Sequence, residues 1–388
     1  MKIKFKKAIS LALVCLSVAL MAGCGNVRIK RPTRLKNRAI ILAVGIDRDE
    51  EKDGYIVTAQ KFSPNGAGAM SAIDPSKTND KVMVGEGKSI TEGFLNMQRK
   101  HGKEIFLGNN SYIIFGKKTA EKGLGEFLSF FNSSYEQNQS ATILISETTA
   151  RDICENKVTQ DIMPASSLEK VTEKSKGITT TGKCYFYSLE ADFLSEKRSA
   201  IVPAVKCGKT YDDKDIYEMV GAYFLEGDRI KDMLSYDEAR GYLILKGDYN
   251  SMFYLLEDRG ESYGIFLSPK KEKTKVRIEN GRLIFDFEIE LIGELREAVG
   301  EQIKKTDREL TQRLQEKMAR QIEKIALDFL RHTATENGCD CLKLSLLTKQ
   351  RLPKEYKKIE KDFNKYLKNA RFNVDVSFKL NNLGLEIA

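Results

Sequence analysis

Short apolar segments alternate with amphipathic ones through the first half of the chain, and this alternation restricts the folds open to it. The strand-like segments are rich in β-branched and aromatic residues and cover 40–45, 55–61, 112–115 and 141–146. The helical segments cover 89–100, 119–131 and 149–157. Strands and helices in this order form sheets that are covered by helices. We predict an α+β (mixed α/β) fold in which helices pack on mixed sheets.

The C-terminal half has longer elements. Apolar residues occupy every second position of 282–292 (RLIFDFEIELI), which predicts a half-buried strand. One long helix is expected over about 297–335, because apolar residues recur there at three-, four- or seven-residue steps. A helix over 356–370 and a strand over 372–380 follow. We expect the long helix to pack its apolar stripe on a sheet.

Two polar segments interrupt these elements. Residues 62–81 are rich in Gly, Pro, Ser and Asn and predict a loop, and residues 206–216 (KCGKTYDDKDI) predict a charged linker. The chain is longer than a single core usually supports. We therefore expect an N-terminal domain over 39–205, divisible into two subdomains, and a C-terminal domain over 217–388 that contains the long helix.

The first 24 residues have the layout of a bacterial lipoprotein signal. Four lysines and no acid precede a 15-residue apolar run from Ala8 to Ala22, and the small residues Ala22 and Gly23 lead into Cys24. At about 1.5 Å per residue the run reaches only ~22 Å, less than a hydrocarbon core of ~30 Å. We predict that 1–23 is a cleaved signal peptide and that Cys24 is lipidated. The alternatives are an ordinary signal peptide and an uncleaved anchor.

The positive charge of the chain is concentrated next to Cys24. Residues 24–38 contain six basic residues and no acid, which leaves 54 basic against 55 acidic residues over 39–388. The basic residues are Arg28, Lys30, Arg31, Arg34, Lys36 and Arg38. A neutral body argues against nucleic acid as a partner, and basic residues beside a lipid anchor attract an anionic bilayer. We predict a basic membrane-proximal tether over 24–38; a merely solvated tether is the alternative.

The cysteines do not predict a metal site or a disulfide framework. Five remain beyond Cys24, an odd and widely spread set in a chain too long to need disulfides. Cys339 and Cys341 follow His332, but zinc sites usually have a two- to four-residue spacer and four ligands. We expect partly buried thiols and neither a metal nor another cofactor.

Two motifs resemble catalytic or nucleotide-binding sequences. Residues 177–183 match G-x-x-x-x-G-K, but Cys184 replaces the hydroxyl that binds magnesium, and a polar segment precedes the motif. Residues 260–264 (GESYG) match the nucleophile elbow of hydrolases, with His332 downstream. Apolar runs flank this turn on both sides, which favours a β-hairpin. We predict that the chain is not an enzyme; an envelope hydrolase that uses Ser262 and His332 remains an alternative.

The order of segments is similar to that of a known family. The similarity lies in the signal that ends at Cys24 and in four later segments. These segments cover 39–61, 85–124, 220–247 and 325–341, and the first contains Gly45-Ile46-Asp47. In this succession the chain resembles the Ger(x)C family, the lipoprotein C subunits of nutrient germinant receptors in spore-forming bacteria. The resemblance covers most of the chain beyond Cys24.

The resemblance implies a lipid-anchored protein on the outer face of the spore's inner membrane. It implies assembly with a membrane-spanning A subunit and a transporter-like B subunit into a complex that responds to nutrients. No catalytic residue is carried over by the resemblance. The alternative within the same setting is a solute-binding lipoprotein that captures a small nutrient itself, which predicts a deep pocket with convergent polar groups.

Overall fold

The computed structural model describes residues 37–62, 80–133, 137–158, 164–174, 181–195, 199–299 and 308–382. The predicted signal peptide, Cys24 and the tether up to residue 36 lie outside these residues, as does most of the predicted loop 62–81. Arg38, which we assigned to the end of the tether, instead begins the first strand.

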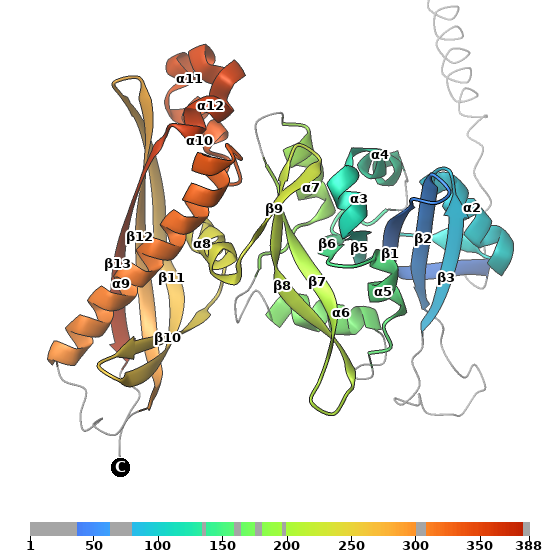
Figure 1. Ribbon diagram of the computed structural model, residues 1–388, viewed down its shortest axis with the longest axis horizontal. Coiled ribbons are helices and arrows are strands. Elements are labelled where there is room, and N and C mark those ends of the chain that lie inside the picture. Colours follow the sequence, from blue (N-terminus) through green and yellow to red (C-terminus); the bar gives the residue numbers. More distant parts are fainter. Residues whose placement is uncertain are drawn as a thin grey trace, which may run out of the picture. The chain divides into compact units, whose positions relative to one another are not determined.

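Nine strands of the described chain form the first sheet, which is parallel in its centre and antiparallel on both sides (Figure 1). Its order is β3-β2-β1-β5-β6-β7-β8-β9, and β4 pairs with β1 outside this path. The pairs β1–β5, β5–β6 and β6–β7 are parallel, and the outer pairs are antiparallel. The strands are β1 (Arg38–Asp49), β2 (Gly54–Phe62), β3 (Asp80–Gly87), β4 (Glu104–Phe106), β5 (Tyr112–Gly116), β6 (Thr142–Ser146), β7 (Ile201–Lys209), β8 (Asp215–Glu226) and β9 (Arg229–Leu234).

Helices cover both faces of this sheet, as the predicted alternation requires. One face buries apolar residues of α2, α3, α4 and α7, and the other buries residues of α5 and α6. The two central strands β5 and β6 are buried along their whole length, which is typical of parallel strands between two helical layers. The helices are α2 (Ile90–His101), α3 (Lys117–Lys122), α4 (Gly125–Ser133), α5 (Ala150–Glu155), α6 (Pro164–Lys174) and α7 (Phe186–Phe193).

The second sheet has the order β10-β11-β12-β13 in the described residues and carries helices on one face (Figure 1). Strand β13 is parallel to β12, and the other pairs are antiparallel. The strands are β10 (Met252–Asp258), β11 (Glu261–Glu279), β12 (Arg282–Val299) and β13 (Arg371–Asn382). The helical segments are α8 (Tyr236–Lys246), α9 (Arg308–Leu330), the π-helix η3 (Arg331–Glu336), α10 (Leu344–Arg351), α11 (Pro353–Ile359), the 3₁₀ helix η4 (Glu360–Asp362) and α12 (Phe363–Lys368).

Helix α9 packs on the second sheet through the predicted apolar stripe. Leu314, Met318, Ile322 and Phe329 are fully buried in the core that β12 and β13 line from the other side. Burial of one such side chain contributes about 1.5–3 kcal/mol to the hydrophobic driving force for folding. The expected packing of this helix on a sheet is therefore confirmed.

Polar side chains of α8 and α9 reach the two edge strands of the second sheet. The backbone N–H groups of Val376 and Leu380 in β13 donate to Glu323 Oε1 at 3.3 Å and Gln315 Oε1 at 2.9 Å. In β10, the carbonyl of Phe253 accepts from Arg240 Nη2 at 2.6 Å, and the carbonyl of Glu257 accepts from Lys317. These side chains cover backbone groups that an edge strand otherwise offers to another chain.

The predicted α+β class and most predicted elements are confirmed, but several boundaries were wrong. The long helix does not begin at 297, because β12 continues to Val299; α9 begins at Arg308. The predicted helix 119–131 is two helices, because Gly123 adopts a φ of 128° that ends α3. The predicted helix 356–370 is a series of short helices that begins at Pro353.

The predicted charged linker at 206–216 was also wrong. Residues 206–209 end β7 and residues 215–216 begin β8, and the short turn 210–214 joins the two paired strands. Charged side chains occur there because the outer ends of the two strands are exposed, and not because the chain leaves the sheet. The first sheet therefore continues through β9 without a break.

Gly241 permits a close approach between α8 and α9. A Cβ atom at this position would lie 2.7 Å from the Ile325 carbonyl oxygen and 3.2 Å from Phe329 Cβ. In an open helix Gly→Ala stabilises by up to ~1 kcal/mol, but overpacking costs about 1–3 kcal/mol. We expect Gly241→Ala to lower the free energy of unfolding by about 1–2 kcal/mol, measured by urea denaturation. An increase in stability would show that the two helices separate freely.

Candidate functional site

Asp47 is a buried carboxylate at the end of β1, directly below helix α5. The backbone N–H groups of Ala150 and Arg151 donate to its two oxygens at 2.8 and 2.9 Å. The residue is only 7% exposed, and burial raises the pKa of the Asp47 carboxyl although the two backbone hydrogen bonds oppose this effect. The carboxylate thus fixes the first turn of α5 on the sheet.

The neighbouring glycines leave room for this arrangement. A Cβ at Gly45 would lie 2.9 Å from both the Ala150 carbonyl oxygen and Cys154 Sγ, and a Cβ at Gly116 would collide with Asp47. Ile46 points to the opposite face of β1, into the core under α2 and α4. The segment Gly45-Ile46-Asp47 is therefore explained by packing: the glycine admits α5, the isoleucine fills a core and the aspartate caps the helix.

A second polar cluster joins the first sheet to the helices of the second. The His332 ring lies between two carboxylates: Nδ1 is 2.9 Å from Glu238 Oε1 and Nε2 is 3.2 Å from Asp232 Oδ2. The planes of the His332 and Phe224 rings are nearly perpendicular, and their centroids are 5.1 Å apart. We call His332, Glu238, Asp232 and Phe224 the seam cluster.

The elements around the seam cluster position each of its side chains. Glu238 belongs to the capping box of α8, in which its Oε2 accepts from the Ser235 N–H at 2.8 Å. Asp232 Oδ1 accepts from the Met233 N–H, and this bond, together with His332, lowers the pKa of Asp232. His332 lies in the π-helical turn that ends α9, and such turns are frequent at functional sites.

Two further contacts cross the same boundary. The Lys343 ammonium lies 2.9 Å from a carboxylate oxygen of Asp192 in α7, and the Ser199 N–H donates to the Asp340 carbonyl at 3.3 Å. Asp340 also accepts from the N–H groups of Leu344 and Ser345, which begins α10. The core of the second sheet includes Phe224 and Leu234 from β8 and β9. The boundary is therefore a packed and hydrogen-bonded contact.

The structure gives no support to the hydrolase alternative. Ser262 lies within β11, where it pairs with Glu257 and Val299 in the sheet, so the predicted hairpin at 260–264 is confirmed. Both ring nitrogens of His332 contact carboxylates, whereas a catalytic histidine must reach its nucleophile. The sequence drew attention to His332 for the wrong chemistry. The Ser235-x-x-Glu238 capping box was the signal that could have pointed to its partner.

The five cysteines of the described chain differ in exposure. Cys154, Cys184, Cys339 and Cys341 are buried, Cys207 is exposed, and these five are free thiols. Burial raises the pKa of Cys207 to about 11 and that of Cys184 to about 12, and it also raises the pKa values of the other three. Thiols with raised pKa values are poor nucleophiles and poor metal ligands at neutral pH. Within the described residues, no group of His, Cys, Asp and Glu could hold a metal ion.

The nucleotide-binding reading of 177–183 is not supported either. Residues 177–180 lie outside the described chain, but the element before them is helix α6, where a phosphate-binding loop requires a strand. Lys183 forms an ion pair with Glu173 at 3.6 Å.

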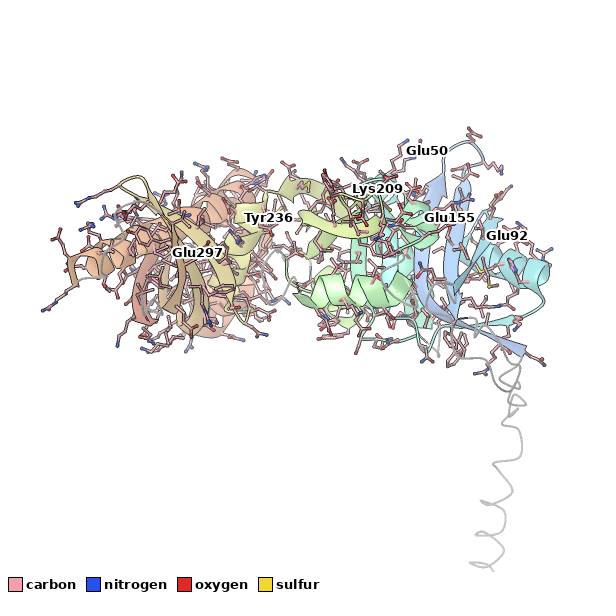
Figure 2. All side chains as sticks on the ribbon, turned by 90° about the horizontal axis from the view of Figure 1, so that it is seen from below. Glu50, Glu92, Glu155, Lys209, Tyr236 and Glu297 are labelled. Atoms are coloured by element: carbon pink, nitrogen blue, oxygen red, sulfur yellow. The ribbon has the colours of Figure 1, made fainter. Side chains whose placement is uncertain are left out.

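The predicted lipidation site and the basic residues from Arg28 to Lys36 lie outside the described residues. In the part of the chain that is described, no helix is both long and apolar enough to cross a membrane. On the surface over the first sheet, Glu50, which is labelled in Figure 2, forms ion pairs with Lys118 at 3.1 Å and with Lys122 at 3.2 Å.

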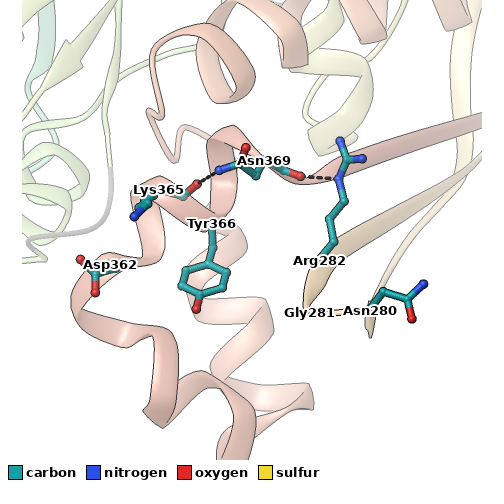
Figure 3. Close-up of a pocket in the computed structure, with 7 residues that line it drawn as sticks. All are labelled: Asn280, Gly281, Arg282, Asp362, Lys365, Tyr366 and Asn369. Carbon is teal, nitrogen blue, oxygen red and sulfur yellow. Dashed lines mark hydrogen bonds between the residues drawn. The ribbon is translucent and has the colours of Figure 1, made fainter.

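A hollow of about 550 Å³ lies beside helix α12 (Figure 3). The turn between β11 and β12 supplies Asn280, Gly281 and Arg282, and the helical side supplies Asp362, Lys365, Tyr366 and Asn369. The lining is mainly polar, unlike the mostly apolar pockets that enclose small ligands. This hollow is open to solvent. It is therefore not the deep pocket that the solute-binding alternative predicts.

Comparison with known proteins decides the family. Residues 32–207 match the family model described as "Spore germination protein N-terminal domain", and residues 220–384 match the one described as "Spore germination B3/GerAC like, C-terminal". The chain belongs to the Ger(x)C family of spore germination proteins.

Named relatives agree with this assignment. Spore germination protein B3 of Bacillus subtilis (strain 168) is 24% identical over 377 residues, or 94% of this chain and 96% of that protein. YfkR of the same organism is 21% identical over 306 residues, or 76% of each chain. The crystal structure of the GerBC protein has the same fold, with a TM-score of 0.53 and 18% identity, and the match covers 87% of this chain and 97% of that one.

The two family models and the two sheets divide this Ger(x)C chain at different places. The C-terminal family model begins at residue 220, inside β8, yet β8 and β9 complete the first sheet. All residues of the seam cluster lie in the part of the chain that the C-terminal family model matches. Asp192 and Ser199, which the N-terminal model matches, contact Lys343 and Asp340 at the same boundary. The family's two sequence halves are therefore interleaved in one folded unit.

The titration of Asp47 gives a test of its burial. Since its pKa is raised in the folded chain, folding binds a proton above the ordinary Asp value, and stability falls as pH rises through that window. Asp47→Asn removes this loss. We expect the stability difference between Asp47→Asn and wild type to shift in favour of the variant as pH rises from about 3 to 7, followed by urea denaturation.

Asp152 in the same helix provides the matched control. Burial alone would raise its pKa, but hydrogen bonds from Thr148 and Thr149 hold the pKa below the ordinary value. Its contribution is therefore present at neutral pH and lost on acidification, so Asp152→Asn should show the opposite trend. A pH-independent difference for Asp47→Asn would contradict the assignment.

Proposed function

We propose that this chain is the lipid-anchored C subunit of a nutrient germinant receptor. The supporting observation is that both family models match in order over nearly the whole chain beyond Cys24. The apolar run near the start of the chain ends in small residues that lead into Cys24, and a cysteine in this position receives the diacylglyceryl group of a lipoprotein. We further propose that the subunit acts by assembly with a membrane-spanning A subunit and a transporter-like B subunit on the outer face of the spore's inner membrane.

The chemistry of the described residues fits an assembly role. The seam cluster and the Asp47 carboxylate hold elements of the fold together, and neither presents a nucleophile beside a base. Attachment to the membrane of its partners would raise the effective concentration of the subunit, because a tethered encounter replaces a free one. Weak protein contacts then suffice for assembly.

The lipid anchor is tested at Cys24. We expect the mature chain from its native host to begin with a diacylglyceryl-modified Cys24, detected by mass spectrometry of the N-terminal peptide. Cys24→Ala should abolish the modified peptide. Cys15→Ala, which changes a cysteine inside the signal, should leave it intact. An unmodified thiol at position 24 in the wild-type chain would contradict the proposal.

Assembly is tested by isolation from spore membranes. We expect a C-terminally tagged wild-type chain, solubilised in mild detergent, to recover a multi-spanning protein and a transporter-like protein in fixed proportion. The Cys24→Ala chain should recover less of both, because it loses the confinement that favours the encounter. Isolation of the wild-type chain alone, with both membrane proteins present in the extract, would count against a receptor subunit.

A further inference from the structure

Residues 349–371 are far more basic than the rest of the body. They contain nine basic and three acidic residues, whereas the remainder of 39–388 contains 45 basic and 52 acidic residues. The segment comprises the end of α10, the helices α11, η4 and α12 and the start of β13, and we call it the basic cap. Its basic residues are Lys349, Arg351, Lys354, Lys357, Lys358, Lys361, Lys365, Lys368 and Arg371.

The basic cap separates apolar and charged side chains completely. Tyr356, Ile359, Phe363 and Leu367 are buried in the core of the second sheet. All nine basic residues are exposed. The short helices thus have one face fixed to the protein and one face that presents lysine and arginine to the surroundings. Figure 1 shows α10, α11 and α12 gathered at one end of α9.

Ion pairing distinguishes the cap from the open face of the second sheet. On the open face of the second sheet, Lys270 and Glu290 form an ion pair at 2.9 Å, and the pairs Lys275–Glu288 and Arg277–Asp286 follow along the strands. Within the described chain, Lys354, Lys357, Lys358 and Lys365 form no such pair. The positive charge of these four lysines is therefore not neutralised by ion pairs within the described chain.

The hollow beside α12 adds hydrogen-bond donors to this charge. Arg282 lies at its edge, where its guanidinium donates to the Asn369 and Ala370 carbonyls, and Lys365 and Tyr366 lie on the opposite side (Figure 3). Asp362 is the single carboxylate in the lining. Guanidinium, ammonium, hydroxyl and amide groups around an open hollow match the oxygens of a phosphate group.

We propose that the basic cap is a docking surface for anionic phospholipid headgroups. Unneutralised lysines attract an anionic bilayer, and each such charge adds to the attraction while it lies within a Debye length of the surface. The inference rests on the proposed function in one respect: the 15-residue segment 24–38, at most ~50 Å long when extended, would keep the body within reach of the bilayer. The occupant is a lipid surface because its phosphates complement both the charge and the donors.

Lysine footprinting of the full lipidated chain tests the proposal. The chain is reconstituted into vesicles of phosphatidylcholine alone or of phosphatidylcholine with phosphatidylglycerol, and acetylation rates of individual lysines are read by mass spectrometry. We expect acetylation of Lys354, Lys357, Lys358 and Lys365 to slow several-fold in the anionic vesicles only, and high salt to remove the difference. Lys118, Lys122 and Lys214, which are 74%, 52% and 60% exposed, should react equally in both.

Matched variants separate the cap from general charge. In the wild-type chain we expect the anionic vesicles to protect Lys349 and Lys368 from acetylation as well. The triple variant Lys357→Gln/Lys358→Gln/Lys365→Gln should lose this protection. Lys118→Gln/Lys122→Gln/Lys214→Gln removes the same charge elsewhere and should leave the protection intact. Equal acetylation of the cap in both vesicles would overturn the proposal. So would protection that appears only in native membranes, because it would assign the surface to a protein partner.

The anchor is measured separately. Flotation with phosphatidylcholine vesicles reports on the lipid at Cys24, because neutral headgroups do not attract the cap. A chain that fails to float with neutral vesicles but is protected by anionic ones would contradict the anchor and support the cap. A chain that floats with both kinds of vesicle but shows no protection of the cap would support the anchor and contradict the cap.

Discussion

The C-terminal half depends on the contact between helix α9 and the four-stranded sheet. The apolar stripe of α9 fills the core, and its polar flanks reach both edge strands: Gln315 and Glu323 bind β13, while Lys317 binds the end of β10. An amphipathic helix that packs on a sheet buries its apolar face there and turns its polar face to solvent. Here it also covers polar backbone groups at both edges, so an added strand from another chain would have to displace side chains that already bind there.

The same helix extends to the boundary between the sheets through its π-helical end. The turn places His332 between Glu238 and Asp232, and it is followed at once by Asp340, which begins α10 and accepts from Ser199. One helix and its π-helical end therefore connect the core of the second sheet with this boundary. The capping box of α8 supplies a partner to His332, so the start of α8 and the end of α9 are held by one carboxylate.

The sequence predicted elements where a single period dominated, and it failed where two elements meet. The alternation in 282–292 and the apolar stripe from Leu314 to Phe329 correspond to β12 and α9. The start of the long helix was misplaced, because Val299 continues the apolar spacing of the helix although it belongs to the strand. The charged segment 206–216 suggested a linker because strand ends that project into solvent have the composition of a loop.

The candidate site was harder to predict because its contacts are distant in sequence. His332 is 94 residues from Glu238, and Ala150 is 103 residues from Asp47. No periodic pattern records such a pair; only the folded chain brings the groups together. By contrast, Gly45-Ile46-Asp47 was noticed as a motif, and the close approach of α5 now gives its physical basis.

Charge is distributed in this chain according to what each surface faces. The open face of the second sheet has a basic residue opposite an acidic one along β11 and β12, an arrangement that stabilises neighbouring strands and leaves little net field. The basic cap has an equally exposed surface but few acids within it. Such an imbalance costs self-repulsion among the lysines, which solvent and salt screen only in part. An external anion that neutralises the cap removes this repulsion among its lysines. The paired face of the sheet has little such repulsion, so the same anion would not stabilise it.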